Sequence, residues 1–467
     1  MPDLPPATLR VAIIGAGPAG FYAAEHLQKQ DLAVDIDLFD RLPTPFGLVR
    51  GGVAPDHQKI KSVTRVYDRL ASHPRFRFLG NVEFGRDITL EDLHRHYHAV
   101  LYACGAPTDR ALGIPGEDLP GSATATAFVG WYNGHPDYRD LRFDLAQESV
   151  AVVGVGNVAM DVARILCRTP EELAATDIAP YALDALAASR IRTVYVLGRR
   201  GPVQAAFTNP EIKELGEMTA ADLVVDPAEL VLDDASRAML ESAEDRTPQK
   251  NLDTLGAAAA RQPAGKPKRI VLRFCVSPVA LEGEGRVERV RLARNRLDPD
   301  GRGGVRAVPT GQEEVIPAGL VFRSVGYRGV ALPGVPFDER ACVIPNEAGR
   351  VRSADGTPLP GQYAAGWIKR GPSGVIGTNK PDAVESVEQL LADHREGRLP
   401  LPPDPRPGAM EAVLRDRGVR VVDYADWKRL DQLEQDAGRP LGRPRVKFTS
   451  VAEMLAALEV PAGKEPG

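Results

Sequence analysis

Two glycine-rich turns, each placed between an apolar run and a helical pattern, constrain the fold of this chain more than any other feature. The first reads GAGPAG at Gly15–Gly20 and follows the run VAII; the second reads GVGNVA at Gly154–Ala159 and follows VAVV. In such a turn the first glycine makes a tight bend, the second lets a pyrophosphate approach the backbone, and the third position packs the helix onto the strand. The chain is therefore predicted to be an α/β protein with two Rossmann-like dinucleotide-binding domains, whose parallel sheets are flanked by helices and smaller β elements.

The first turn has the features of an FAD site. Gly15, Gly17 and Gly20 occupy the three glycine positions, and Asp40 ends the run VDIDLFD where this fingerprint expects an acid. A carboxylate there accepts hydrogen bonds from ribose hydroxyls, and the N-terminus of the following helix faces the phosphate charge. A glycine turn that binds no ligand is the alternative.

The second turn has the features of an NADPH site. Gly154 and Gly156 are followed by Ala159, an allowed variant of the third glycine, and the next strand, IRTVYVLGRR, ends in Arg199 and Arg200. An NAD site would carry a carboxylate at this point, whereas two guanidinium groups suit the 2′-phosphate of NADP. The glycine turn and the two arginines are farther apart in sequence than is usual for this fingerprint. Residues 167–190 are therefore expected to form an additional helical excursion. Ordinary surface charges are the alternative for both arginines.

The second fingerprint is expected to lie in a domain inserted into the first. AVLYACGA (Ala99–Ala106) and GLVFRSVGYR (Gly319–Arg328) are similar strand–turn segments at places suited to crossings between domains. We therefore expect an FAD-binding domain in residues 1–107, an inserted NADPH-binding domain in residues 108–328, and the remainder of the FAD-binding domain with a C-terminal extension in residues 329–467. A third strand–turn–helix segment, Gln362–Leu391, belongs to this last part.

Four further segments have local signatures. Arg286–Arg296 partly alternates apolar and basic residues, which predicts a strand with a solvated face. Asp233–Ala264 is rich in charge and alanine and is predicted to form surface helices. The proline-rich Arg398–Gly408 is predicted to be a semi-rigid linker, and Asp423–Gly438 a helix.

Composition and spacing exclude several functions. Cys104, Cys167, Cys275 and Cys342 never form a C-x-x-C pair, which excludes a dithiol redox centre and indicates reduced thiols of an intracellular protein. No histidine spacing indicates a metal site. The net charge of −5 gives no reason to expect nucleic acid. Because neither an apolar leader nor an apolar run of membrane-spanning length is found, a cytoplasmic protein without a membrane span is expected.

Longer motifs resemble the adrenodoxin reductase family of NADPH–ferredoxin reductases. They are TPFGLVRGGVAPDHQKIKSV (Thr44–Val63), TDIAPYALDALAASRIRTVYVLGRRGPVQAAFT (Thr176–Thr208), GWIKRGPSGVIGTNK (Gly366–Lys380) and GRPLGRPRVKF (Gly438–Phe448). Together with the two glycine turns, they extend the resemblance over nearly the whole chain.

The resemblance implies a set of cofactor contacts at the matching positions. On the FAD side they are Ala19, Asp40, Leu48, Val82, Trp367, Gly374, Val375 and Ile376, of which Trp367 and the last three would lie along the isoalloxazine ring. On the NADPH side they are Arg110, Gly156, Asn157, Val158, Ala159, Arg199, Arg200 and a glutamate of the segment EIKE. Glu211 and Glu214 compete for that last role. Asp40 stands where many members of the family have glutamate.

The resemblance also implies catalytic roles for His57 and Glu214. His57 would lie near the flavin and donate a hydrogen bond or relay a proton. A solvated loop histidine is the alternative for His57, and a core tryptophan is the alternative for Trp367. Independently of the resemblance, a helix that begins near Thr378–Pro381 would present free N–H groups able to stabilise negative charge on reduced flavin.

The function implied by the resemblance is that of a ferredoxin–NADP⁺ oxidoreductase. A hydride would pass from NADPH to N5 of FAD, and single electrons would then pass to an iron–sulfur ferredoxin. Because the whole chain is net acidic, an acidic ferredoxin would dock transiently on a local basic patch, for which the candidates are Lys369, Arg370, Arg443, Arg445 and Lys447. Two alternatives remain open: an NADPH-dependent flavin oxidoreductase that acts on quinone or another acceptor, and a non-catalytic NADPH-sensing flavoprotein.

Overall fold

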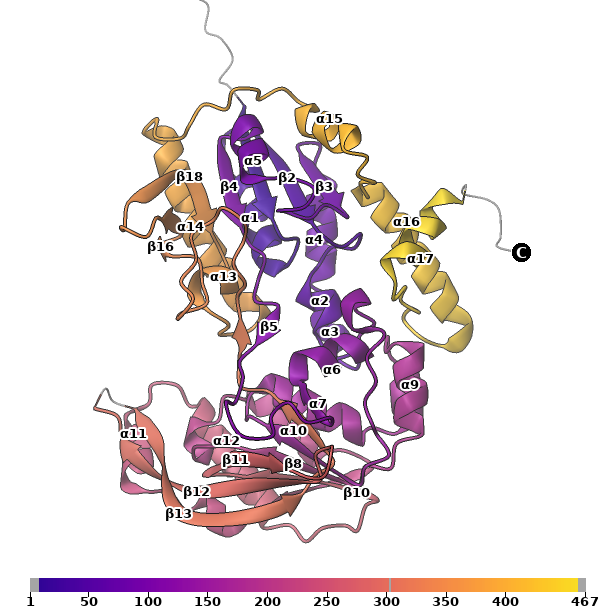
Figure 1. Ribbon diagram of the computed structural model, residues 1–467, viewed down its shortest axis with the longest axis vertical. Helices are drawn as coiled ribbons and strands as arrows, with labels where there is room; N and C mark the ends of the chain where they lie inside the picture. The colour runs from indigo at the N-terminus through magenta and orange to yellow at the C-terminus, as the bar shows by residue number, and fades with distance from the viewer. Residues whose placement is uncertain (1–7, 302–303, 461–467) are drawn as a thin grey trace, which may run out of the picture. The chain divides into compact units, whose positions relative to one another are not determined.

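The computed structural model describes residues 8–301 and 304–460, and the chain divides into two compact units (Figure 1). Unit 1 comprises the chain up to Val53, His57–Thr108 and the chain from Tyr327 onward. Unit 2 comprises Ala54–Asp56 and Asp109–Gly326. The chain thus passes between the units after Thr108 and after Gly326, one and two residues from the expected boundaries, and the sequence did not predict that Ala54–Asp56 belongs to unit 2.

Unit 1 is built on a sheet with the strand order β16-β17-β18-β4-β1-β2-β3. Strands β18, β4, β1, β2 and β3 pair in parallel, and β16 and β17 continue the sheet in antiparallel fashion. Every residue of β1 is buried, as expected for a strand that is covered on both faces. The strands are β1 (Leu9–Ile14), β2 (Val34–Asp40), β3 (Phe76–Gly80), β4 (Ala99–Tyr102), β16 (Asn346–Glu347), β17 (Arg350–Arg352) and β18 (Pro358–Ala364).

The helices of unit 1 follow the glycine turns and cover this sheet. Helix α1 packs beside α14, as Figure 1 shows, and the third strand–turn–helix segment of the sequence corresponds to β18 and α14. The helices before the extension are α1 (Pro18–Gln28), α2 (Leu48–Gly51), α3 (Gln58–Lys61), α4 (Thr64–Ala71), α5 (Leu90–His96), α13 (Trp367–Arg370), η4 (Ile376–Thr378) and α14 (Asn379–Arg395). Short strands β5 (Thr108–Asp109) and β15 (Tyr327–Arg328) lie where the chain passes between the units.

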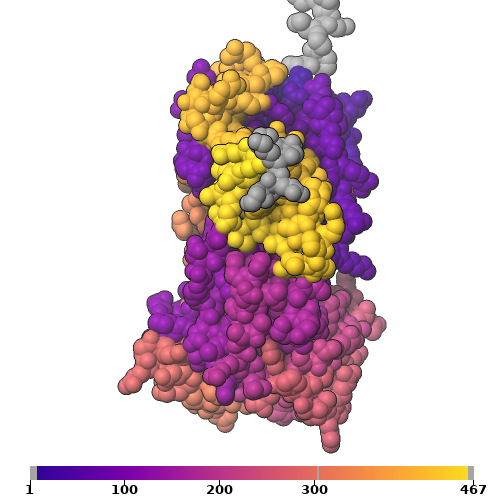
Figure 2. All heavy atoms as spheres, turned by 90° about the vertical axis from the view of Figure 1, so that its right-hand side faces the viewer, coloured from indigo at the N-terminus to yellow at the C-terminus, as the bar shows by residue number. Residues whose placement is uncertain are grey.

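The C-terminal extension is part of the core of unit 1. Its helices are α15 (Ala409–Asp416), α16 (Tyr424–Gly438), η5 (Arg439–Leu441) and α17 (Val451–Glu459), drawn in yellow tones in Figure 2. Trp427 and Leu430 of α16 join the same apolar cluster as Val11 and Ile13 of β1. The segment Arg398–Gly408 is not a free linker, because Arg10 donates to the carbonyl oxygen of Pro405 at 2.9 Å and His96 bonds that of Asp404 at 2.8 Å.

Unit 2 is built on a parallel sheet with the strand order β6-β14-β7-β8-β10-β9. An antiparallel sheet, β11-β12-β13, is connected to it, and β12 includes most of the strand predicted from alternating basic residues. The strands are β6 (Ser122–Thr124), β7 (Ser149–Val153), β8 (Thr193–Leu197), β9 (Ala221–Val225), β10 (Lys268–Arg273), β11 (Val276–Glu282), β12 (Arg289–Pro299), β13 (Val305–Pro317) and β14 (Leu320–Arg323).

The helices of unit 2 include the additional excursion expected between the second glycine turn and the arginines. That excursion is α8 (Pro170–Ala174) and α9 (Pro180–Ala187), and the region rich in charge and alanine forms α11 (Asp234–Ser242) and α12 (Thr247–Ala259). The other helices are α6 (Ala125–Tyr132), η1 (Pro136–Tyr138), α7 (Asn157–Cys167), η2 (Pro202–Gln204), α10 (Asn209–Gly216) and η3 (Pro227–Leu230). Within the described residues, no helix combines the length and the apolar character that crossing a bilayer requires.

Candidate nucleotide-binding sites

The first glycine turn joins β1 to α1 and permits no side chain at two of its positions. Gly15 has φ of +111°, and a Cβ atom on it would lie 2.5 Å from the carbonyl oxygen of Ala103. A Cβ atom on Gly20 would overlap the carbonyl oxygen of Gly15. These two glycines are therefore required by the fold itself, because strand, turn and helix pack closely.

Gly17 differs from both, because its Cα faces open space. A Cβ atom there would have no heavy atom within 4 Å, and the backbone φ of −86° is one that any residue adopts. Gly17 is the N-cap of α1, and no side chain caps this helix. The free N–H groups of the first turn therefore fit an anion such as the pyrophosphate of FAD. Ala19, on the same turn of helix, is buried.

Asp40 ties the glycine turn to the end of β2. One carboxylate oxygen accepts from the backbone N–H of Ala16 at 2.9 Å, and the other accepts from that of Leu42 at 3.0 Å. Burial raises the pKa of Asp40, while the amides of Leu42 and Ala16 act in the opposite direction. A carboxylate has about four lone-pair sites, so two remain for ribose hydroxyls.

Two of the residues predicted to contact the flavin are apolar and exposed. Leu48 on α2 is 40% exposed and Val375, the N-cap of η4, is 52% exposed. Ile376, which follows Val375, is partly buried. Val82 is buried instead, and its N–H donates to the carbonyl oxygen of Asp40, which leaves only its own carbonyl oxygen for a cofactor.

Trp367 is held by its own chain. Its indole N–H donates to the carbonyl oxygen of Ser373 at 3.2 Å, and its ring lies 5.0 Å from that of Tyr327. The N–H group is therefore occupied, and what the side chain offers a cofactor is its partly exposed ring. Gly374 has φ of +78°, and a Cβ atom on it would overlap Thr378, so the loop before α14 requires glycine here. Helix α14 begins at Asn379, within the predicted range, and no side chain caps it.

His57 lies at the N-terminus of α3 in unit 1, directly after the three residues assigned to unit 2. Its side chain is half-buried, and its carbonyl oxygen accepts from the N–H of Ile60 at 3.0 Å. The residue predicted to lie on a loop is thus the N-cap of a short helix.

The second glycine turn, between β7 and α7, repeats the geometry of the first. Gly154 has φ of +133°, and a Cβ atom on it would overlap the carbonyl oxygen of Ser324. A Cβ atom on Gly156 would have no heavy atom within 4 Å, and α7 also lacks a side-chain cap. Asn157 accepts from the N–H of Thr208 at 2.8 Å, which holds the following loop against the helix, while Ala159 is fully buried and Val158 partly buried.

Three arginines of unit 2 are available to an anion. Arg199 and Arg200 follow β8, and Arg110 lies near the start of the unit; within the described ranges none of the three guanidinium groups donates a hydrogen bond or forms an ion pair. Burial, and next the charge of Arg199, lower the pKa of Arg200. Two adjacent cations that form no ion pair in the described chain favour binding of a dianion such as a 2′-phosphate.

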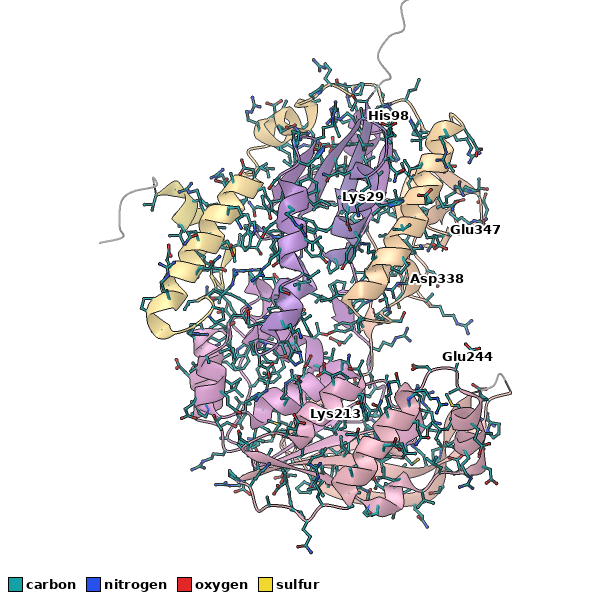
Figure 3. The ribbon with its side chains drawn as sticks, turned by 180° about the vertical axis from the view of Figure 1, so that it is seen from behind. Lys29, His98, Lys213, Glu244, Asp338 and Glu347 are labelled. Carbon is teal, nitrogen blue, oxygen red and sulfur yellow. The ribbon has the colours of Figure 1, made fainter. Side chains whose placement is uncertain are left out.

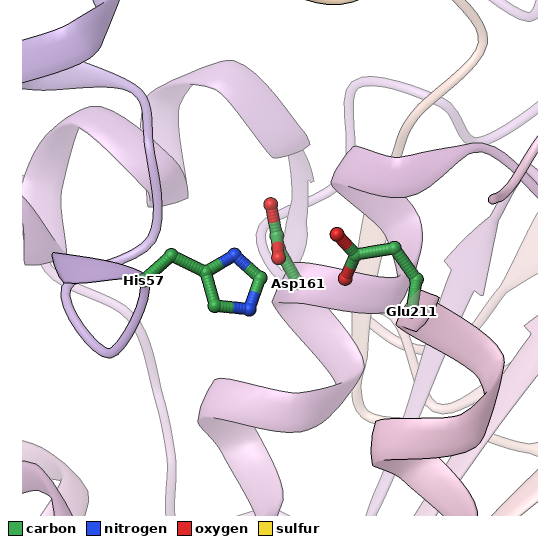
Figure 4. Close-up of side chains that lie close together, drawn as sticks. All are labelled: His57, Asp161 and Glu211. Carbon is green, nitrogen blue, oxygen red and sulfur yellow. The ribbon is translucent and has the colours of Figure 1, made fainter. Parts of the chain in front are cut away.

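The two glutamates of EIKE have different surroundings. Glu211 on α10 is buried and accepts from Arg164 at 3.0 Å, while the side chain of Glu214 is 40% exposed and lies 3.6 Å from the same guanidinium. Figure 4 shows the carboxylates of Glu211 and of Asp161 on α7 approaching each other. Lys213, labelled in Figure 3, is exposed.

Arg164 was missed by the sequence analysis. It is fully buried in α7 and pairs with Asp56 at 2.8 Å, Asp161 at 2.6 Å and Glu211. Burial alone would lower its pKa, but the three carboxylates together hold the pKa of Arg164 above its ordinary value. The available signal was a charged residue on the apolar face of the helix VAMDVARIL.

The basic residues predicted to dock a ferredoxin are mostly buried or paired. Lys369, Arg443 and Lys447 are each at most 8% exposed, and Lys369 pairs with Asp382 at 3.3 Å. The remaining pairs are Arg370 with Asp382, and Arg445 with Asp431 and Glu434. The prediction that these five cations form a free surface patch was wrong, because three of them are buried and the other two, Arg370 and Arg445, pair with carboxylates of unit 1.

Comparisons with known proteins identify relatives of this chain. A family model described as pyridine nucleotide-disulphide oxidoreductase matches residues 9–195. The NADPH-ferredoxin reductase FprA of Mycobacterium tuberculosis is 46% identical over 456 residues, which cover 95% of this chain and 98% of that protein. The human mitochondrial NADPH:adrenodoxin oxidoreductase is 44% identical over 465 residues, which cover 97% of this chain and 92% of that protein. A solved structure of M. tuberculosis FprA in complex with NADPH matches with a TM-score of 0.90 at 44% identity, covering 97% of this chain and 100% of that one.

Proposed function

This chain belongs to the adrenodoxin reductase family of NADPH–ferredoxin reductases, and on that basis we propose that it is an FAD-dependent ferredoxin–NADP⁺ oxidoreductase. The observation that carries the proposal is the pair of open glycine turns, one beside the carboxylate of Asp40 and the other followed by two unpaired arginines. An acid at the first turn and arginines after the second assign FAD to unit 1 and NADP(H) to unit 2.

The chain's own residues would bind and align the two nucleotides. The N-termini of α1 and α7 hold the pyrophosphates, while Asp40 accepts from ribose hydroxyls of FAD and Arg199 and Arg200 bind the 2′-phosphate of NADPH. FAD, when bound, supplies an acceptor for a hydride and a donor of single electrons. The exposed Leu48 and Val375 and the ring of Trp367 would exclude water from the flavin ring.

We assign His57 and Glu214 as candidate catalytic residues and Glu211 as a binding residue. The greater exposure of Glu214 leaves its carboxylate more accessible to a substrate, whereas Glu211 is held by the buried Arg164. An imidazole can donate and accept a hydrogen bond through its two ring nitrogens, which suits His57 to proton transfer.

Anaerobic reduction tests the function. The purified protein should be yellow, release FAD on denaturation, and lose its colour with NADPH but far more slowly with NADH. Addition of an oxidised ferredoxin should then restore the colour. Recovery of FMN would contradict the FAD site. Restoration by quinones but by no ferredoxin would favour a quinone-directed oxidoreductase, and a flavin that NADPH does not bleach would favour a sensor.

We propose an acidic iron–sulfur ferredoxin as the transient partner and the cytoplasm as the location. The four free cysteines, none in a disulfide, support a reducing compartment. Since the first candidate patch is internally neutralised, the docking surface should be sought among exposed cations of unit 1 that have no ion pair in the described chain. Lys59 on α3 and Arg65 and Arg69 on α4 meet this condition, and Ile60, next to Lys59 in sequence, is an apolar side chain that is 44% exposed. We call these four residues the α3–α4 surface.

Reversal of two of these charges should weaken docking. We expect Arg65→Glu with Arg69→Glu to raise the KM for ferredoxin about tenfold at low salt, because exposed charges steer association and are screened at high salt. The difference from wild type should shrink with ionic strength, while reduction by NADPH stays unchanged. The matched control is Arg95→Glu with Arg415→Glu, which changes the net charge by the same amount at exposed residues of α5 and α15. Equal weakening by both double variants would reject the α3–α4 surface.

A further inference from the structure

We propose that Asn295 is a positioning residue for recognition of the 2′-phosphate of NADPH. It lies on β12, in the antiparallel sheet of unit 2, distant in sequence from both glycine turns. Its side-chain amide holds the peptide of Arg199, one of the two unpaired arginines that follow β8. The inference rests on the proposed NADPH site and adds to it a residue that makes no contact with the nucleotide through its own side chain.

The amide of Asn295 makes two hydrogen bonds that fix its orientation. Its nitrogen Nδ2 donates to the carbonyl oxygen of Arg199 at 2.9 Å and to Oγ of Ser277 at 2.8 Å. Because a backbone carbonyl can only accept, the atom that faces Arg199 must be the nitrogen. Asn295 is 9% exposed, so water cannot readily replace these bonds.

The turn after β8 is held at three consecutive carbonyl groups. That of Gly198 accepts from the N–H of Val276 at 3.0 Å, and that of Arg200 accepts from the N–H of Cys275 at 3.1 Å. Both are backbone bonds, which no substitution other than proline at the donor removes directly. The carbonyl of Arg199 is the one held by a side chain. A substitution of Asn295 can therefore release this peptide without changing the backbone bonds on either side of it.

The sheet is locally irregular at the residue that reaches Arg199. The pairing of β12 with β13 shifts register between Ala293 and Asn295, and the N–H of Asn295 donates to the carbonyl oxygen of Cys275 at 2.8 Å. Cys275 itself has φ of +54°, which is rare for a residue with a side chain. A β-bulge re-aims a side chain, and here it accompanies a side chain bonded to the arginine turn.

The arginines need this support because they repel each other. The charge of Arg199 contributes to lowering the pKa of Arg200, and the charge of Asp300 acts in the opposite direction. Within the described chain neither guanidinium forms a hydrogen bond or an ion pair that would hold it in place. Recognition of a phosphate by two guanidinium groups depends on their relative orientation. Holding the peptide of Arg199 fixes the origin of its side chain before the nucleotide binds, which reduces the entropy lost on binding.

The test is Asn295→Leu, which keeps the size of the side chain and removes the donor. Binding to the holoenzyme is measured for 2′,5′-ADP and for 5′-AMP, which differ by the 2′-phosphate. We expect the Kd for 2′,5′-ADP to rise about fivefold to tenfold, as for loss of one buried hydrogen bond, and the Kd for 5′-AMP to stay the same. The KM for NADPH should rise likewise, with kcat and the KM for NADH retained.

Ser277→Ala is the matched control, because it removes the other acceptor of the same amide and leaves the bond to Arg199. It should retain the wild-type ratio of affinities. Asn295→Asp, which lacks the donor and adds a negative charge, provides a second variant if the leucine variant does not fold, and should weaken 2′,5′-ADP more strongly. Equal losses for both ligands, or no loss, would overturn the positioning role. A wild-type protein without preference for 2′,5′-ADP would instead refute the NADPH site itself.

Discussion

Gly17→Val should yield a folded protein that purifies colourless. A Cβ atom at this position would meet no protein atom within 4 Å, and valine accepts the extended backbone of the N-cap, so the chain should still fold. The same side chain would occupy the space over the free N–H groups of α1, where we propose that the pyrophosphate of FAD binds. We expect FAD occupancy to fall from nearly complete to nearly none, measured as the ratio of flavin absorbance to protein in gel-filtered samples.

Gly156→Val, the same change at the equivalent position of the second turn, is the control. Its Cβ atom also meets no protein atom within 4 Å, so this variant should remain yellow and be reducible by dithionite while NADPH no longer bleaches it. Gly15→Val gives the contrasting case, because its Cβ atom would lie 2.5 Å from the carbonyl oxygen of Ala103 and should destabilise unit 1. Full FAD occupancy in Gly17→Val would show that the pyrophosphate lies elsewhere.

The parts of the fold that follow from local sequence were predictable. Each glycine turn combines a conformational requirement with a packing requirement within about 20 residues, so its pattern can be recognised without knowledge of the rest of the chain. The additional helices α8 and α9 were predictable for a similar reason, since the long separation between the second turn and Arg199 had to be filled.

The parts that depend on pairing between distant residues were not predictable. Arg164 binds Asp56, which precedes it by more than 100 residues, and nothing in either segment indicates the other. Asn295 and Arg199 are likewise 96 residues apart, and the alternation of β12 gave no reason to distinguish this asparagine from its neighbours. The local sequence shows residue types, whereas these contacts depend on how distant segments pack against each other in the fold.

The failed docking prediction has the same cause. Lys369 and Arg370 are basic in sequence, but α14 places Asp382 beside both of them. Arg445 is neutralised by Asp431 and Glu434 of α16, which the extension brings against it. A cation is available to a partner only when the fold leaves it unpaired, and that condition favoured Arg65 and Arg69 over residues in the recognisable motifs.

Removal of both arginines after β8 should abolish the preference for NADPH. Within the described residues, Arg199 and Arg200 form no ion pair, so Arg199→Ala with Arg200→Ala breaks no salt bridge. Each charge-assisted hydrogen bond contributes about 1.5–3 kcal/mol, so loss of two should raise the KM for NADPH on the order of 100-fold or more. The KM for NADH, which carries no 2′-phosphate, should change little, and kcat should be retained with both nucleotides.

Two comparisons decide whether this loss reflects phosphate binding. Arg190→Ala with Arg192→Ala removes two exposed arginines that precede the same strand, and should leave the KM for NADPH unchanged. Raising the ionic strength should increase the KM for NADPH in the wild-type protein and much less in the Arg199/Arg200 double variant, because salt screens an interaction that the variant no longer makes. If the double variant still preferred NADPH, Arg110 or another cation would have to bind the 2′-phosphate, and the assignment of the arginine pair would be wrong.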